Sequence, residues 1–192
     1  MLLRDKRVVK SRRALIETGI TELPQNPSAT LTEIAEIAGI GRATLYRHFA
    51  SREVLIEEIL KVSLEDIIKA LAPMDKENLR GKRAMIRGLE LLLPLADRIR
   101  FMATFWVEAD KVLSKDYRAE WLDGAAIEAV EQAKEDGDIR KDLPTRWIAD
   151  CYDALIFSAW ELVTEGEVTT DEMTALLATT FFEGVGVKPA RA

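Results

Sequence analysis

The side chains best suited to chemistry in this chain of 192 residues gather in one short stretch, residues 42–48, which reads RATLYRH. Most of its side chains donate hydrogen bonds and none is acidic. Carboxylates are repelled by the field of a nucleic-acid duplex, whereas arginines and hydroxyl groups bind phosphates and base edges. The predicted chemistry is therefore recognition of DNA by a helix, and not a reaction.

Catalytic alternatives find little support in the sequence. His48 is the only histidine and Cys151 the only cysteine, so a Ser-His-Asp or Cys-His arrangement elsewhere in the chain is impossible. An intrachain disulfide and a multi-cysteine zinc site are excluded for the same reason. No Glu-x-x-His pair and no glycine-rich phosphate loop is present, so we expect no metal and no cofactor. A hydrolase that uses carboxylates alone stays open, although no pattern points to one.

Two short helices joined by a tight turn are predicted around the stretch. Thr30 followed by Glu33 is typical of a capping box at a helix start, and Gly39 suits the left-handed residue that ends a helix. Gly41 can cap the second helix, and Ser51 can cap a third. This arrangement predicts a helix-turn-helix, whose second helix enters the major groove of DNA. An ordinary helical hairpin is the alternative.

The run GIGRATLYRHFASREVL, residues 39–55, resembles the signature of the tetracycline-repressor (TetR) family of bacterial transcription regulators. The resemblance implies a three-helix DNA-binding domain, a helical ligand-binding domain and a homodimer. It also implies that Tyr46 and His48 bind phosphates while Arg42, Ala43 and Thr44 face base edges. One departure is Gly41, where the family usually has Ser or Thr. The predicted DNA-binding residues are Thr30, Arg42, Ala43, Thr44, Tyr46, Arg47, His48, Ser51 and Arg52.

The charge distribution removes an apparent contradiction, because the whole chain is acidic with a net charge of −6. Residues 1–52 hold nine Lys/Arg and five Asp/Glu, a net of +4, whereas the remaining 140 residues carry a net of −10. A basic end on an acidic body indicates that the first part faces DNA. The alternative is that the basic residues between positions 4 and 13 form only a solvated tail.

Helical periodicity dominates the rest of the chain and strand signals are nearly absent. We therefore expect an all-α fold of about nine helices. It would comprise a helix-turn-helix domain over residues 1–52 and a larger ligand-binding and dimerisation domain over 53–192, linked by a helix over 51–72. No apolar run follows the basic start and no stretch is long enough to cross a membrane. A soluble, cytoplasmic protein is expected.

The last two helices are apolar over more than one face, which favours a four-helix dimer interface over burial inside a monomer. The residues predicted for this interface are Ile148, Cys151, Leu155, Leu162, Leu177 and Phe181. Aromatic and methionine side chains elsewhere could line an apolar pocket for a small molecule, although core packing is the alternative for each. The residues predicted for this pocket are Met102, Phe105, Trp106, Trp121, Tyr152, Ile156 and Trp160.

These observations predict a sequence-specific, homodimeric transcription regulator. We expect a repressor that binds a palindromic operator and is released when a small-molecule inducer shifts it between two states. A helical interaction protein or ligand sensor that does not bind DNA is the alternative. The sequence does not identify the inducer or the operator, and activation instead of repression stays open.

Overall fold

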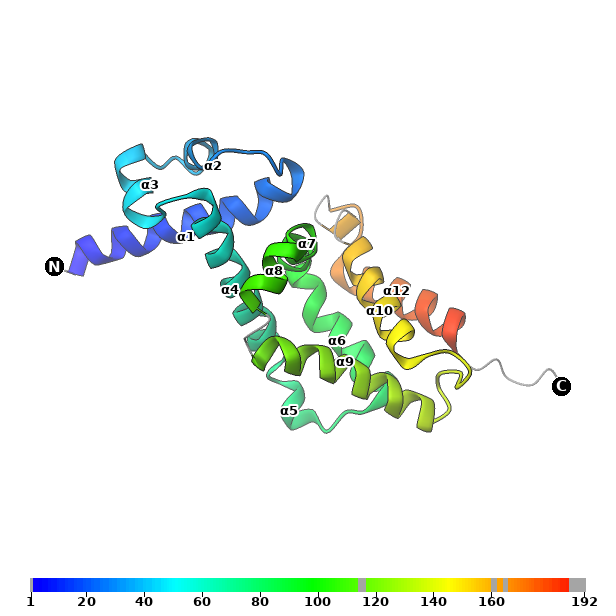
Figure 1. The fold of residues 1–192 in the computed structure, drawn as a ribbon. Helices are drawn as coiled ribbons and strands as arrows, with labels where there is room; N and C mark the ends of the chain where they lie inside the picture. Colours follow the sequence, from blue (N-terminus) through cyan, green and yellow to red (C-terminus); the bar gives the residue numbers. More distant parts are fainter. Residues whose placement is uncertain (1, 114–116, 160–161, 164–165, 187–192) are drawn as a thin grey trace. The chain divides into compact units, whose positions relative to one another are not determined.

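The computed structural model describes residues 2–113, 117–159, 162–163 and 166–186, and its regular elements are helices (Figure 1). Within that part of the chain, the only bridge of strand type is the isolated pair Ile139 and Gly186. The predicted all-α fold is confirmed. In chain order the elements are α1 (Leu2–Gln25), α2 (Leu31–Ile37), α3 (Arg42–His48), α4 (Arg52–Leu71), α5 (Met74–Glu77), α6 (Gly81–Leu92), η1 (Leu93–Leu95), α7 (Ala96–Thr104), α8 (Trp106–Leu113), α9 (Tyr117–Glu135), α10 (Thr145–Ser158) and α12 (Thr170–Val185).

The chain packs as two compact units. The first contains residues 1–63 together with 100–115, and the second contains 64–99 together with 116–192. Helices α4 and α7 therefore each contribute to both units. The domain boundary predicted at residue 52 separates DNA binding from ligand binding, whereas these two units are defined by packing. The predicted boundary therefore stays a prediction.

The first unit is built around a core shared by α1, α2, α3 and the start of α4. Leu15, Leu45 and Phe49 lie in this core with almost no exposed surface. Phe101 and Phe105 from the α7–α8 segment belong to the same core, and their ring centroids lie 4.8 Å apart. A segment that follows more than forty residues after the helix-turn-helix thus helps to hold it in shape.

In the second unit, α6 packs against α9 and α12, and α10 packs against the same two helices. Tyr152 lies in the core of this unit, where its hydroxyl donates to the carbonyl oxygen of Met85 at 2.7 Å. Burial, with a smaller contribution from the charge of Asp153, raises the pKa of Tyr152 far above its ordinary value. This phenol is therefore a neutral packing group. Among the described helices, none combines the length and apolar character that a membrane span needs.

Candidate DNA interface

The turn between α2 and α3 has the geometry that its sequence predicts. The Thr30 hydroxyl accepts from the Glu33 amide at 3.2 Å, and the Glu33 carboxylate accepts from the Thr30 amide at 2.7 Å, so the predicted capping box is confirmed. Gly39 has φ +68°, and the amide of Ile40 donates to the carbonyl of Ala35 at 2.8 Å. This is the Schellman arrangement, in which a left-handed residue lets the chain turn and satisfies the last helical carbonyls.

The side chains of helix α3 differ in burial from one face of the helix to the next. Leu45 is fully buried and anchors the helix to the core, while Phe49 closes the same side just beyond the last turn. At about 100° per residue, Ala43 and Arg47 lie opposite Leu45 and face outward, and both are exposed. Arg42 and Tyr46 occupy one flank and are also exposed, whereas Thr44 and His48 occupy the other flank and are half-buried.

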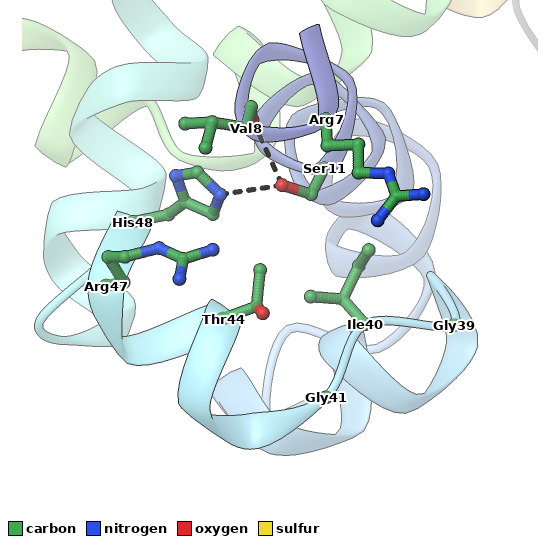
Figure 2. A pocket seen from close by; sticks show the side chains of 9 residues that line it. All are labelled: Arg7, Val8, Ser11, Gly39, Ile40, Gly41, Thr44, Arg47 and His48. Atoms are coloured by element: carbon green, nitrogen blue, oxygen red, sulfur yellow. Dashed lines mark hydrogen bonds between the residues drawn. The ribbon is translucent and has the colours of Figure 1, made fainter. Parts of the chain in front are cut away.

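The half-buried flank of α3 borders a hollow of about 490 Å³ between this helix and α1 (Figure 2). Two guanidinium groups and three hydrogen-bonding side chains line the hollow, together with two apolar side chains and two glycines, and none of the lining residues is acidic. They are Arg7, Val8, Ser11, Gly39, Ile40, Gly41, Thr44, Arg47 and His48. Figure 2 shows Thr44 and Arg47 projecting from α3 on one side of the hollow and Arg7 projecting from α1 on the other.

The chain's single histidine borders the hollow and is held by Ser11. The Ser11 hydroxyl lies 3.0 Å from the carbonyl oxygen of Val8 and forms a hydrogen bond of 2.8 Å with Nε2 of His48. Partial burial, followed by the charges of Arg47 and Arg12, lowers the pKa of His48 below its ordinary value. The lowered pKa favours the neutral imidazole at pH 7.

The arginines of α1 and α3 whose side chains the structure describes fall into two groups. Arg12 pairs with Glu58 and lies 5.6 Å from the centre of the Phe49 ring, and Arg13 lies 3.8 Å from Glu17. By contrast, the guanidinium groups of three other arginines have no carboxylate partner anywhere in the described residues; they are Arg7, Arg42 and Arg47. All three lie on α3 or border the hollow, and their charge is available to an anion.

Arg52, predicted from the sequence as a DNA contact, is occupied within the protein. Its Nε donates to the carbonyl of Ala29 at 2.9 Å and its Nη2 donates to the carbonyl of Pro27. The guanidinium carbon lies 5.8 Å from the centre of the Phe105 ring. The neighbouring Ser51 hydroxyl accepts from the Val54 amide at 3.4 Å and acts as a helix cap. The sequence pattern did not indicate that Arg52 holds the loop before α2.

Sequence reasoning also missed Ser11 and did not single out Arg7 for this site. Both lie on α1, more than thirty residues before α3, and only the tertiary packing brings them to His48 and Thr44. The basic run between residues 4 and 13 was the available signal for Arg7. No comparable signal marks Ser11, because a serine in a helix is usually a neutral surface residue.

The residues predicted for a ligand pocket do not form one group. Phe105 is buried in the first unit with Met102 packed against its core, and Trp106 is 66% exposed. Tyr152 and Ile156 are buried in the core of the second unit. Trp121 and Trp160 lie outside the residues whose side chains the structure describes. The pocket therefore stays a prediction.

The residues predicted for the dimer interface are divided between core and surface. Three of them are buried against other parts of their own unit: Ile148, Leu177 and Phe181. Cys151 and Leu155 are half-buried, and Leu162 is 36% exposed. The large apolar side chains that α10 and α12 expose most are Trp147, Leu176 and Phe157, at 59%, 51% and 43%.

Among the described residues, no group of three or more His, Cys, Asp or Glu side chains could hold a metal ion.

Residues 26–59, which cover α2, α3 and the loops around them, match the family model described as bacterial regulatory proteins, tetR family. This segment is a TetR-family domain. The resemblance found in the sequence is thereby confirmed, and the chain is a DNA-binding transcriptional regulator. The matched family is regulatory and not enzymatic.

Relatives extend the likeness along most of the chain. The HTH-type transcriptional repressor LfrR of Mycolicibacterium smegmatis is 24% identical over 157 residues, which are 82% of this chain and 81% of LfrR. Its structure with proflavine has a TM-score of 0.65 at 21% identity, covering 93% of this chain and 97% of that one. The ketosteroid regulator KstR2 of Mycobacterium tuberculosis has a TM-score of 0.70 at 17% identity, covering 92% and 95%. These two structures establish the shared fold.

Proposed function

We propose that the protein is a homodimeric repressor that binds a palindromic operator through α3 and leaves it when a small molecule binds the second unit. The observation that carries the DNA-binding part is the state of the arginines. Those that border α3 have no carboxylate partner in the described residues, whereas Arg12 and Arg13 of α1 are paired. Guanidinium groups that no carboxylate neutralises, on or beside an exposed helix, are typical of a surface that binds a polyanion.

Base contacts are proposed for the outward and outer-flank residues of α3. Arg42 and Ala43 are exposed beside or opposite the buried Leu45, and neither lines the hollow, so they are free to face the bases. Arginine can donate two hydrogen bonds to guanine, and an alanine methyl group can contact the methyl group of thymine. Tyr46, which is 55% exposed, stays predicted to bind a phosphate.

Dimerisation is proposed through the exposed apolar side chains of α10 and α12. Trp147, Phe157 and Leu176 project from these helices, and aromatic side chains are enriched at the centres of protein interfaces. Two symmetric copies would present two α3 helices, which a palindromic operator requires. This proposal replaces the buried Ile148 and Phe181 with side chains that a second copy can reach.

We also propose that a small-molecule effector binds the second unit. LfrR was solved with proflavine, and a ligand that prefers one of two states would shift this chain between them. The protein would act in the cytoplasm, where its operator lies, and would have no catalytic activity. The one histidine lies beside Ser11 in the proposed DNA interface, and in this proposal the pair serves DNA binding.

The proposal is tested by titrating the protein against a duplex from its own promoter and against a scrambled duplex, at several salt concentrations. A repressor should prefer the promoter duplex by at least about a thousandfold, and its affinity should fall steeply as salt rises. Equal affinity for both duplexes would contradict the proposal and favour a sensor or interaction protein that does not read DNA. Trp147→Ser, combined with sedimentation, tests the dimer separately.

A further inference from the structure

The hollow between α1 and α3 is more than a space beside the reading helix, because of what lines it. Arg7 and Arg47 bring two guanidinium groups, Thr44 brings a hydroxyl, and none of the lining residues is acidic. Neither arginine has a carboxylate partner in the described residues. Guanidinium groups bind phosphate oxygens through parallel N–H donors. The lining therefore suits a phosphate and disfavours a cation or a neutral apolar molecule.

The position of the hollow on α3 indicates where that phosphate would come from. The major groove is about 12 Å wide, and a helix with its side chains is about 10–12 Å across, so an inserted helix nearly fills the groove. The outward face then meets the bases, and the two flanks meet the sugar–phosphate walls. Thr44 and His48 lie on the flank that turns toward α1, and the long side chain of Arg47 also lines the hollow although its position is on the outward face. These side chains and Arg7 would therefore face one wall together.

We infer that the hollow seats one backbone phosphate of the duplex, held between Arg7 of α1 and Arg47 of α3 with the Thr44 hydroxyl as a third donor. This inference rests on the proposed DNA binding, and it makes α1 a phosphate-binding helix as well as a scaffold. Ser11 has a supporting role. Its bond to Nε2 of His48, at 2.8 Å, fixes the imidazole at the edge of the hollow and keeps the ring from filling it.

The test is a cycle between protein variants and duplexes that each carry one neutral methylphosphonate in place of one phosphate. For the wild-type dimer, one phosphonate position in each half-site should weaken binding about tenfold, the loss expected for one charge-assisted contact. Arg7→Ala should weaken binding to the unmodified duplex by a similar factor, and should lower the salt slope by about one. At that one phosphonate position, Arg7→Ala should cause little further loss.

Three variants serve as controls. Arg13→Ala removes a charge from the same helix but outside the hollow, where Arg13 lies beside Glu17, so its phosphonate profile should match that of the wild type. Arg42→Ala should alter sequence preference and leave the sensitive phosphonate position unchanged. Arg7→Lys keeps the charge without the forked donor and should lie between wild type and Arg7→Ala. Arg7 is exposed, and thermal unfolding will show that each variant folds.

The phosphate in the hollow could also be one dissolved in the cell and not part of DNA. Adding pyrophosphate to the protein–DNA complex, with chloride at equal ionic strength as the control, distinguishes these two sources. If Arg7→Ala and wild type are equally sensitive at every phosphonate position, the assignment to the duplex is overturned. If pyrophosphate then displaces DNA from wild type alone, the hollow belongs to a dissolved phosphate. In either case, a retained preference for the promoter duplex leaves the proposed function intact, whereas loss of that preference in the wild type would count against the function itself.

Discussion

Replacing Arg52 by alanine should lower the folding stability of the helix-turn-helix, and not only its affinity for DNA. The Arg52 guanidinium donates to the carbonyls of Ala29 and Pro27 and lies 5.8 Å from the Phe105 ring centre. Ala29 is buried whereas Pro27 is exposed, so only the first carbonyl loses its partner without easy access to water. Loop residues 26–30 would then lose the contact that holds them beside the first turn of α4.

The expected loss follows from these three contacts. The bond to the buried Ala29 residue contributes about 1.5–2 kcal/mol, because the donor is charged. The bond to the exposed Pro27 contributes about 0.5 kcal/mol, and the contact with the Phe105 ring about 0.5–1 kcal/mol. Freeing the arginine side chain returns about 1 kcal/mol of conformational entropy. The net loss of unfolding free energy should therefore be about 2 kcal/mol.

Urea denaturation of the full chain measures this loss, and hydrogen exchange at the amides of α2 shows whether it is local. Arg42→Ala is the matched control, since Arg42 is exposed and has no ion pair in the described residues; its cost should stay below about 0.5 kcal/mol. If Arg52→Ala instead leaves stability unchanged and lowers DNA affinity with a smaller salt slope, Arg52 is a phosphate contact and the structural argument is refuted.

Three further predictions follow from single contacts. Gly88→Ala should cost about 1–3 kcal/mol, because a Cβ there would lie 2.8 Å from the Tyr152 hydroxyl; Gly124→Ala, with open space around it, should cost nothing, and an equal effect in both would contradict this. Thr30→Ala should cost about 1 kcal/mol in denaturation experiments while Thr30→Ser costs little, since the serine keeps the cap. In NMR titration the single imidazole should show a pKa below 6.5, and Arg47→Ala should raise it; a wild-type midpoint above 6.5 would be contrary to the structure. Because the folded-state pKa of this histidine is lowered, the unfolded chain takes up its proton first, so stability should fall as pH drops below about 6.5.

The features that the sequence predicted well are those decided by neighbouring residues. The capping box at Thr30 and the left-handed Gly39 depend only on backbone geometry within a few positions, and the structure has both. The division of α3 into a buried Leu45 and an acid-free remainder that is exposed or half-buried follows from helical periodicity and composition. Features that depend only on neighbouring residues can therefore be predicted before the fold is known.

Partners chosen by tertiary packing were not predictable. Ser11 and His48 are separated by 37 positions, and Arg52 lies 23 positions beyond the carbonyl of Ala29 that it binds. Periodicity also identifies an apolar stripe without saying what covers it. Ile148 and Phe181 belong to such stripes on α10 and α12, yet the core of their own unit covers them, and the exposed Trp147 lies on another face.

An acidic protein can bind a polyanion when its positive charges are left unpaired at one place. At physiological salt, charges more than about 8 Å apart in water are largely screened, so a net charge of −10 over residues 53–192 has little effect on a duplex held at α3. What matters is the local balance: Glu58 already neutralises Arg12, whereas Arg7 and Arg47 carry their charge into the hollow. An added carboxylate at Thr44 should therefore weaken DNA binding far more than one added to the acidic body, although both changes alter the net charge equally.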